Sequence, residues 1–350
     1  MKIGIPREIK VLEGRIALTP AATRELVKHG HHVFVKKNAG LLSGYSNKEY
    51  SDAGATLLNT AKDVYDNAEL IVKVKEPQKS ELKYLRKDHI LFSFLHLAAE
   101  PDLTKHLLDI GLTAVAFETV ANNKQLPLLA PMSDIAGRIA VQVGTHLLHQ
   151  PQGGRGILLG GVAGTERGRV VILGGGIAGS GATQIASALG ANVLVFDPNR
   201  DKQIKLEAMG LNVTAKQPLD IDIEQAVKDA DLLIGAVLIP GAKTPHLVSA
   251  EQVKSMKAGS VIIDISVDQG GCIETTRPTT YEDPTFVWED VIHFGVTNMP
   301  GAVPRTSTQA LSAVLLPYVL QLCEVDWQSN PALASGINLQ NGEIILPTLM

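Results

Sequence analysis

The chain has 350 residues, a length typical of two domains. It contains 32 Lys and Arg against 36 Asp and Glu, a net charge of −4, and 45% of its residues are hydrophobic. This composition can build large cores, so it excludes a disordered chain, a coiled coil and a collagen-like fibre. A mildly acidic chain without basic runs is also a poor candidate for binding nucleic acid.

Cysteine content and the N-terminus indicate the compartment. Cys272 and Cys323 lie far apart and form no C-x-x-C pattern. We therefore expect neither a disulfide scaffold nor a cysteine-based zinc site, and no metal ligands are predicted. The N-terminus carries charge and a proline before any apolar run, unlike a signal peptide, and no apolar stretch reaches the roughly 18 residues of a membrane span. These features predict a cytoplasmic protein with no membrane partner.

In the first 117 residues, short β-branched runs alternate with amphipathic Ala/Leu-rich runs. This alternation is typical of βαβ units with parallel sheets. The predicted strands are residues 2–6, 32–35, 70–74, 90–94 and 114–117. The predicted helices are residues 20–29, 47–53 and 102–110. Thr19 before Pro20 has the pattern of a helix N-cap, and Gly111 that of a C-cap.

A long helical pattern over residues 133–149 precedes a second βαβ series. Its predicted strands are residues 170–173, 193–197, 232–235 and 261–264. A small-residue helix is expected over 182–189 and a last helix over 306–322. The tail after Asn330 is weakly patterned, and no element is predicted there. The whole pattern predicts an α/β protein with two Rossmann-like, doubly wound domains of parallel sheet.

The segment from Gly174 to Gly179 fits the pattern G-x-G-x-x-G between a strand and a helix. Gly174 would allow the tight turn, Gly176 the approach of a pyrophosphate, and Gly179 close packing of helix on strand. Asp197 ends the next strand 18 residues after Gly179 and could accept hydrogen bonds from ribose hydroxyls. Its charge would repel a 2′-phosphate, which favours NAD over NADP, although Arg200 lies close. The alternative is a glycine-rich turn without a ligand.

Three predicted strands in the N-terminal half lead to Arg15, Lys75 and His96. Ligands of open parallel sheets bind beyond the carboxyl ends of the strands. Arginine can grip a carboxylate, lysine can polarise a carbonyl, and histidine can exchange a proton near neutral pH. Each residue taken alone has a plainer interpretation: a solvated arginine, a strand-terminating lysine and a structural histidine.

The strand at 261–264 leads to Asp268 and two glycines, at the sheet edge that carries the glycine motif. The nicotinamide half of a dinucleotide would lie close to Asp268. A second turn, Asn298–Gly301, follows on the same edge. Both segments could instead be ordinary turns.

Seven segments are similar to signatures of the alanine dehydrogenases, and they occur in order over nearly the whole chain. They are residues 6–9, 15–20, 73–77, 128–133, 236–243, 264–272 and 296–300. The family shares its fold with the NAD-binding component of proton-translocating transhydrogenases. Those proteins carry an Arg-Ala-Gln…Met-Asp loop where this chain reads Pro127 to Ser133, which favours the dehydrogenase.

The resemblance implies NAD-dependent, reversible oxidative deamination of L-alanine to pyruvate and ammonium. Arg15 and Lys75 would bind the substrate, and His96 and Asp268 would be the catalytic acid–base pair. The residues expected to contact NAD, together with Gly174 and Gly176, are Ser133, Ala178, Gly179, Asp197, Lys202, Val237, Leu238, Ile265, Ser266, Val267, Asp268, Arg277, Val296, Thr297, Asn298 and Met299. The resemblance also implies a homo-oligomer, usually a hexamer.

We therefore expect a substrate domain of residues 1–128, completed by 306–350, and an NAD-binding Rossmann domain of residues 129–305. The active site is expected in the cleft between them. The alternatives are a transhydrogenase component that binds NAD(H), a dehydrogenase of a larger amino acid such as saccharopine or lysine, and a non-catalytic NAD sensor.

Overall fold

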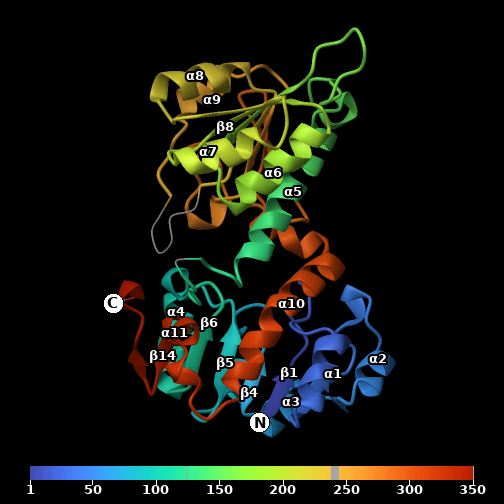
Figure 1. Cartoon of the computed structure of the whole chain (residues 1–350), viewed down its shortest axis with the longest axis vertical. Coiled ribbons are helices and arrows are strands. Elements are labelled where there is room, and N and C mark those ends of the chain that lie inside the picture. The colour runs from blue at the N-terminus through green and yellow to red at the C-terminus, as the bar shows by residue number, and fades with distance from the viewer. Residues whose placement is uncertain (124, 238–243, 350) are drawn as a thin grey trace. The chain divides into compact units, whose positions relative to one another are not determined.

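The computed structural model describes residues 1–123, 125–237 and 244–349. The chain forms two units, one of Met1–Met132 with Gly301–Met350 and one of Ser133–Pro300. We call them unit 1 and unit 2. Each has its own sheet with helices packed on it (Figure 1). Unit 1 thus contains both ends of the chain, while unit 2 is one continuous segment.

The sheet of unit 1 has eight strands in the order β15-β14-β6-β5-β4-β1-β2-β3. Its strands are β1 (Lys2–Ile5), β2 (His32–Lys36), β3 (Thr56–Leu58), β4 (Leu70–Val72), β5 (Ile90–Ser93), β6 (Thr113–Ala116), β14 (Ile337–Gln340) and β15 (Glu343–Ile344). The first six pair in parallel, and β14 and β15 extend the edge beside β6 as antiparallel strands. The carboxyl ends of β1, β4, β5 and β6 therefore lie at one edge, which positions the loops that follow them.

Several helices of unit 1 begin at side-chain caps, formed by Thr19, Ser46, Thr60 and Asn330. The helices of this unit are α1 (Pro20–Lys28), α2 (Asn47–Asp52), α3 (Ala61–Asn67), α4 (Pro101–Ile110), α10 (Pro304–Leu322) and α11 (Pro331–Gly336), with short 3₁₀ turns at Leu41–Ser43, Leu82–Tyr84, Leu97–Ala99, Trp327–Ser329 and Pro347–Leu349. The Thr19 hydroxyl accepts the Ala22 N–H, as expected of an N-cap before Pro20. Gly111 ends α4 at φ +76°.

Two sets of contacts hold unit 1 together. Tyr65 of α3 and Leu107 of α4 pack with Ile71 and Leu91 of the sheet in one buried cluster. Helix α10, drawn in orange-red in Figure 1, ties the end of the chain to its beginning. Its Thr308 and Ser312 hydroxyls accept the N–H groups of Ile16 and Thr19, each at 3.0 Å. The loop after β1 is therefore anchored by a helix almost 300 residues away.

Unit 2 has a seven-stranded sheet in the order β12-β13-β11-β10-β7-β8-β9. Its strands are β7 (Arg169–Leu173), β8 (Asn192–Phe196), β9 (Val213–Lys216), β10 (Leu232–Gly235), β11 (Val261–Asp264), β12 (Thr285–Trp288) and β13 (Val291–Phe294). All neighbours pair in parallel except β12, which is antiparallel to β13. β10 and β11 are buried along their whole length, as expected of apolar strands covered on both faces.

Helices cover the sheet of unit 2 (Figure 1). They are α5 (Ala130–Leu147), which starts in unit 1, and α6 (Ile177–Ala188), α7 (Arg200–Glu207), α8 (Asp220–Asp229) and α9 (Ala250–Lys254), with 3₁₀ turns at Gln150–Gln152, Val267–Gln269 and Met299–Ala302. Gly137 lets α5 lie against α6, because a Cβ there would collide with the Ala178 carbonyl oxygen.

The predicted fold class is confirmed, with one refinement: the sheets are mixed rather than purely parallel. The strands at 232–235 and 261–264 have the predicted bounds. The helix expected at 182–189 begins earlier, at Ile177, because Gly176 is its N-cap. The weakly patterned tail contains α11, β14 and β15. No described helix is long and apolar enough to cross a membrane.

Candidate functional site

Three glycines shape the turn between β7 and α6. Gly174 has φ +95°, a conformation that L side chains rarely adopt. A Cβ on Gly179 would collide with the carbonyl oxygen of Gly174, so glycine is required for the helix to pack on the strand end. A Cβ on Gly176 would meet no described atom within 4 Å. The side of the turn at Gly176 is therefore open, and the backbone there can be approached closely.

The open turn leads into the N-terminus of α6. Its N-cap, Gly176, has no side chain, and the first turn of the helix contains no acidic residue. The first N–H groups of a helix have no acceptor within the helix and lie at the positive end of its dipole. An anion such as a pyrophosphate fits this position.

Asp197 follows β8 directly and is 4% exposed. Its Oδ2 accepts the Gly175 N–H at 2.9 Å, and its Oδ1 accepts the Asn199 N–H at 2.8 Å. The Lys202 ammonium lies 3.4 Å from Oδ2. The carboxylate thus ties the end of β8 to the glycine turn and stands where a ribose beside the pyrophosphate could reach it.

The ends of β10, β11 and β13 continue the same edge of the sheet. The Ser266 hydroxyl donates to the Val237 carbonyl at 2.7 Å, which joins the segments after β11 and β10. The Ile265 N–H donates to the Gly235 carbonyl at 2.8 Å. Tyr281 donates its hydroxyl proton to the Met299 carbonyl at 2.8 Å, which holds the turn after β13.

Buried Asp264 organises the segment that carries Asp268. Its carboxylate accepts the N–H groups of Ser266 and Cys272, each at 2.9 Å, and the Thr276 hydroxyl at 2.9 Å. Burial raises the pKa of Asp264 against the opposing effect of these hydrogen bonds. Asp268 lies in the resulting 3₁₀ turn, with its side chain exposed.

The predicted cofactor residues of unit 2 fall into three groups. The first group lies at the ends of β7 and β8 and comprises Gly174, Gly176, Ala178, Gly179, Asp197 and Lys202. The second group follows β10, β11 and β13 and comprises Val237, Ile265, Ser266, Val267, Asp268, Val296, Thr297, Asn298 and Met299. Ser133 lies in the first turns of α5, and exposed Arg277 stacks over the Phe286 ring at 4.3 Å. Leu238 lies outside the described residues.

Arg15 is buried in unit 1, at 2% exposure, so it is not the solvated surface arginine of the plainer interpretation. Glu13 holds it from one side, accepting from Nε at 2.7 Å and from Nη2 at 2.5 Å. Its Nη1 contacts the Met132 sulfur at 3.2 Å. The guanidinium is therefore fixed in orientation, which suits it to bind a planar anion.

Lys75 follows β4 and is partly buried. Desolvation lowers its pKa, and the positive charges of Arg15 and Lys10 lower it further. The positive charges of Arg15 and Lys75 in unit 1 therefore repel one another. An anionic ligand would relieve that repulsion.

A buried charge cluster forms around Lys73, two residues before Lys75. Lys73 Nζ is 2.8 Å from Glu81 and 3.5 Å from Glu8, and all three side chains are almost fully buried. Glu8 Oε1 also accepts the Val74 N–H at 2.6 Å, which links the loop after β1 to the segment carrying Lys75. Burial raises the pKa of Glu8 to about 7, although Lys73 and the Val74 N–H oppose the shift.

We expect Glu8 to make stability depend on pH. Its carboxyl titrates near 4.5 when unfolded and near 7 when folded, so the folded chain holds the proton more tightly. The stabilisation is therefore complete below pH 4.5 and is lost as the pH rises to about 7, a change of about 3 kcal/mol. Urea unfolding from pH 5 to 8 should show this loss in the wild type and not in Glu8→Gln. Equal pH slopes for the two proteins would refute it.

His96 follows β5 with φ +51° and ψ +36°, in the left-handed region. Its side chain is 45% exposed, which does not fit a fully packed structural histidine. The ring stacks on Phe94 at 5.9 Å. Desolvation by the surrounding protein lowers the pKa of His96, Glu118 raises it, and Lys75 lowers it. Lys75 thus interacts electrostatically with both Arg15 and His96 in unit 1.

Four acidic residues that support the site received no role from the sequence: Glu8, Glu13, Glu118 and Asp264. Glu8 lies in the signature segment 6–9, Glu13 lies two residues before Arg15, and Asp264 is the last residue of a predicted strand. Glu118 carried one signal, its place directly after a predicted strand. Among the described residues, no cluster of three His, Cys, Asp or Glu could hold a metal ion.

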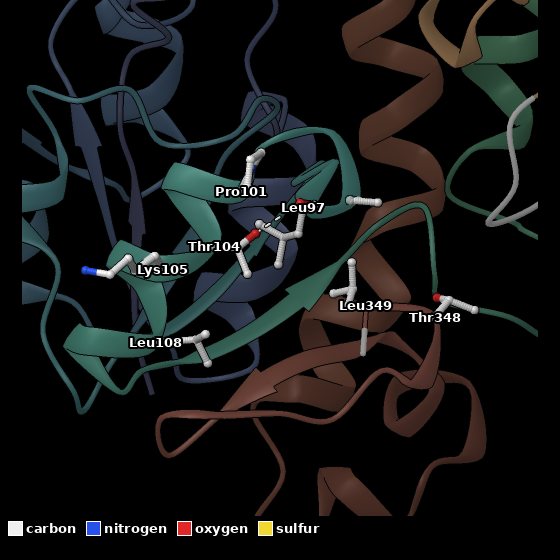
Figure 2. A pocket seen from close by; sticks show the side chains of 8 residues that line it. Leu97, Pro101, Thr104, Lys105, Leu108, Thr348 and Leu349 are labelled. Atoms are coloured by element: carbon white, nitrogen blue, oxygen red, sulfur yellow. Dashed lines mark hydrogen bonds between the residues drawn. The ribbon is translucent and has the colours of Figure 1, made fainter.

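A pocket of about 340 Å³ lies next to the His96 turn but lacks the chemistry of a substrate site. Figure 2 shows its mainly apolar lining from Leu97, α4 and the C-terminal Thr348 and Leu349, with Lys105 as the charged lining residue. The Thr104 hydroxyl donates to the Leu97 carbonyl at 3.0 Å, which fastens the turn after His96 to α4.

Comparison with known proteins agrees with this arrangement. Residues 4–136 match the model "Alanine dehydrogenase/PNT, N-terminal domain", and residues 140–347 match "Alanine dehydrogenase/PNT, C-terminal domain". Alanine dehydrogenase of Methanococcus maripaludis is 51% identical over 98% of this chain and 94% of its own. Alanine dehydrogenase of Bacillus subtilis is 49% identical over 98% of this chain and 92% of its own.

A solved structure named L-alanine dehydrogenase is similar over the full length. It covers 100% of this chain and 98% of its own, with a TM-score of 0.96 and 48% sequence identity. The identity is spread over both units rather than confined to the glycine motif. The chain therefore belongs to the alanine dehydrogenase/PNT family.

Proposed function

We propose that this chain is an L-alanine dehydrogenase, which converts L-alanine, NAD and water reversibly to pyruvate, ammonium, NADH and a proton. The observation that carries the proposal is the edge of unit 1, where a buried, oriented arginine, a partly buried lysine and a half-exposed histidine interact. A small amino or keto acid offers each of them a partner: a carboxylate, a carbonyl or amine, and a transferable proton.

Arg15 and Lys75 are proposed to bind the substrate. Glu13 fixes the orientation of the Arg15 guanidinium, which would bind the substrate carboxylate. Lys75 would balance the remaining charge and polarise the carbonyl oxygen of pyruvate. Holding the substrate in this way directs its Cα–H bond, and positioning of this kind can lower a barrier by several kcal/mol.

His96 and Asp268 are proposed to exchange protons with the amine and with the attacking water. The lowered pKa of His96 favours the neutral imidazole, which can accept a proton near neutral pH. Asp268, in the turn organised by Asp264, would supply a carboxylate to the same reaction.

The cofactor is proposed to be NAD, held by the carboxyl edge of the unit 2 sheet. The open glycine turn fits a pyrophosphate, and Asp197 is suited to ribose hydroxyls. When bound, NAD would accept the hydride that leaves Cα of alanine. The residues after β10, β11 and β13 would hold the remaining part of the dinucleotide.

We also propose roles for the two units and an assembly. Residues 1–128 with 306–350 would be the substrate domain, and residues 129–305 the NAD-binding domain. The family resemblance favours a homo-hexamer in the cytoplasm. Light scattering of the purified protein in solution would measure directly how many chains the assembly contains.

A spectrophotometric NADH assay tests the proposed function. L-Alanine with NAD should give turnover, and glycine, L-serine and L-lysine should give less. The assay is repeated with NADP and in the reverse direction with pyruvate, ammonium and NADH. Binding of NADH without any alanine turnover would point to a transhydrogenase component, and preference for L-lysine to a dehydrogenase of larger amino acids.

A further inference from the structure

Glu118 contacts the backbone of the His96 turn. It lies in the segment after β6, next to the end of β5 in the sheet. Its Oε1 accepts the His96 N–H at 2.6 Å and the Leu95 N–H at 3.2 Å, and its Oε2 accepts the Leu95 N–H at 3.3 Å. A non-glycine residue in the left-handed region is uncommon and needs support from its surroundings. The carboxylate of Glu118 supplies that support.

The same carboxylate approaches the His96 imidazole. Oε1 of Glu118 is 4.0 Å from Nδ1, while the ring lies nearly parallel to Phe94, with an interplanar angle of 6°. The Glu118 side chain is 17% exposed, against 45% for His96. The ring is therefore stacked on Phe94, and its Nδ1 is on the side of the Glu118 carboxylate. The other ring nitrogen, Nε2, lies on the side of the ring away from Glu118.

Four charged groups act on His96 from the loops around it. Glu118 lies after β6, Lys75 and Glu76 after β4, and Lys10 after β1. Glu118 and Glu76 favour the protonated imidazole, whereas Lys75 and Lys10 oppose it. Desolvation by the surrounding protein opposes it as well and is the largest of these influences. Glu118 is the acidic group with the strongest effect and the one that also contacts the backbone of the turn.

We propose that Glu118 is a positioning residue for His96: its carboxylate holds the left-handed turn and directs Nδ1 toward itself, so that Nε2 takes and gives the proton. The proposal rests on the alanine dehydrogenase activity proposed above. It assigns Glu118 two separable contributions. The oxygen atoms accept backbone N–H groups, and the negative charge favours the imidazolium form.

The experiment compares pH profiles of kcat/KM for L-alanine in the wild type and in Glu118→Gln. Glutamine keeps an oxygen that can accept the His96 N–H but removes the charge. We expect the limb assigned to His96 to move to lower pH by roughly one unit. We expect kcat to fall about tenfold, with the KM for alanine within about twofold of the wild type. Glu118→Ala, which also loses the backbone acceptor, should lose more in kcat.

Glu100→Gln is the matched control. Glu100 is exposed, follows the His96 turn closely in the chain, and its side chain makes no cap hydrogen bond to α4. The Glu100→Gln substitution also removes one negative charge near the His96 turn, and it should leave the pH profile of kcat/KM unchanged. Circular dichroism and NADH fluorescence show whether each variant is folded and whether unit 2 still binds its ligand.

The outcomes separate this proposal from the proposed function. Absence of alanine turnover in the wild type would contradict the function itself. An active wild type with an identical pH profile in folded Glu118→Gln would overturn the role of Glu118. A loss of kcat without a shift of the His96 limb would overturn it too, because a purely structural residue would behave in that way.

Discussion

His96→Ala and Asp268→Ala are each expected to lower kcat for L-alanine oxidation by roughly 10²- to 10⁴-fold, the usual contribution of a general acid or base. His96 lies in unit 1, apart in the chain from the glycine turn and Asp197, so its removal should leave cofactor binding intact. Asp268 is exposed in its turn, and the fold of that turn depends on Asp264. Steady-state kinetics measures the loss of kcat, and a fluorescence titration with NADH measures cofactor binding separately.

His106→Ala is the matched control for the histidine. His106 is exposed on α4, and its Nδ1 lies 2.7 Å from the Asp102 carbonyl oxygen of the same helix. Its removal should leave kcat unchanged. Asp268→Asn tests whether the charge of Asp268 matters or only its shape. Near-normal turnover in both His96→Ala and Asp268→Ala would remove the two residues from the mechanism.

Asp197→Ala is expected to weaken NAD and to admit NADP in part. Loss of hydrogen bonds from the ribose to a charged acceptor should raise the KM for NAD by roughly ten- to a hundredfold. The Lys202 ammonium, now 3.4 Å from Asp197, would lose that partner and could bind a 2′-phosphate instead. The ratio of kcat/KM for NADP to that for NAD should therefore rise by at least about tenfold.

Asp197 also accepts N–H groups of Gly175 and Asn199, so its removal can loosen the turn itself. Asp197→Asn separates the two effects, since asparagine retains an oxygen acceptor and loses the charge that repels phosphate. Asp201→Ala, at an exposed position of α7, is the control for a carboxylate lost nearby. A cofactor ratio equal to that of the wild type in Asp197→Ala would refute the ribose role.

The local pattern of apolar, polar and glycine residues was sufficient to predict much of the fold. The strands Leu232–Gly235 and Val261–Asp264 were predicted with their observed bounds because each is an apolar run that begins directly after a polar residue, Asp231 or Ser260, as expected of a strand buried on both faces. The glycine turn was equally readable, because a positive φ at Gly174 and a close approach at Gly179 exclude other residues. Parallel strand order then explains why Arg15, Lys75 and His96 lie at one edge.

The sequence by itself therefore determined the α/β class, the glycine turn and the strand ends that present reactive side chains. Only the tertiary structure decided which groups support them. Glu118 reaches a turn 22 residues away, Glu8 reaches Val74 across 66 residues, and Thr308 reaches Ile16 across 292. The antiparallel pairing of β14 with β6 is a contact of the same kind. Local periodicity records whether a residue is buried, but not which distant atom satisfies its hydrogen bonds, because that partner is chosen by the packing of the whole sheet.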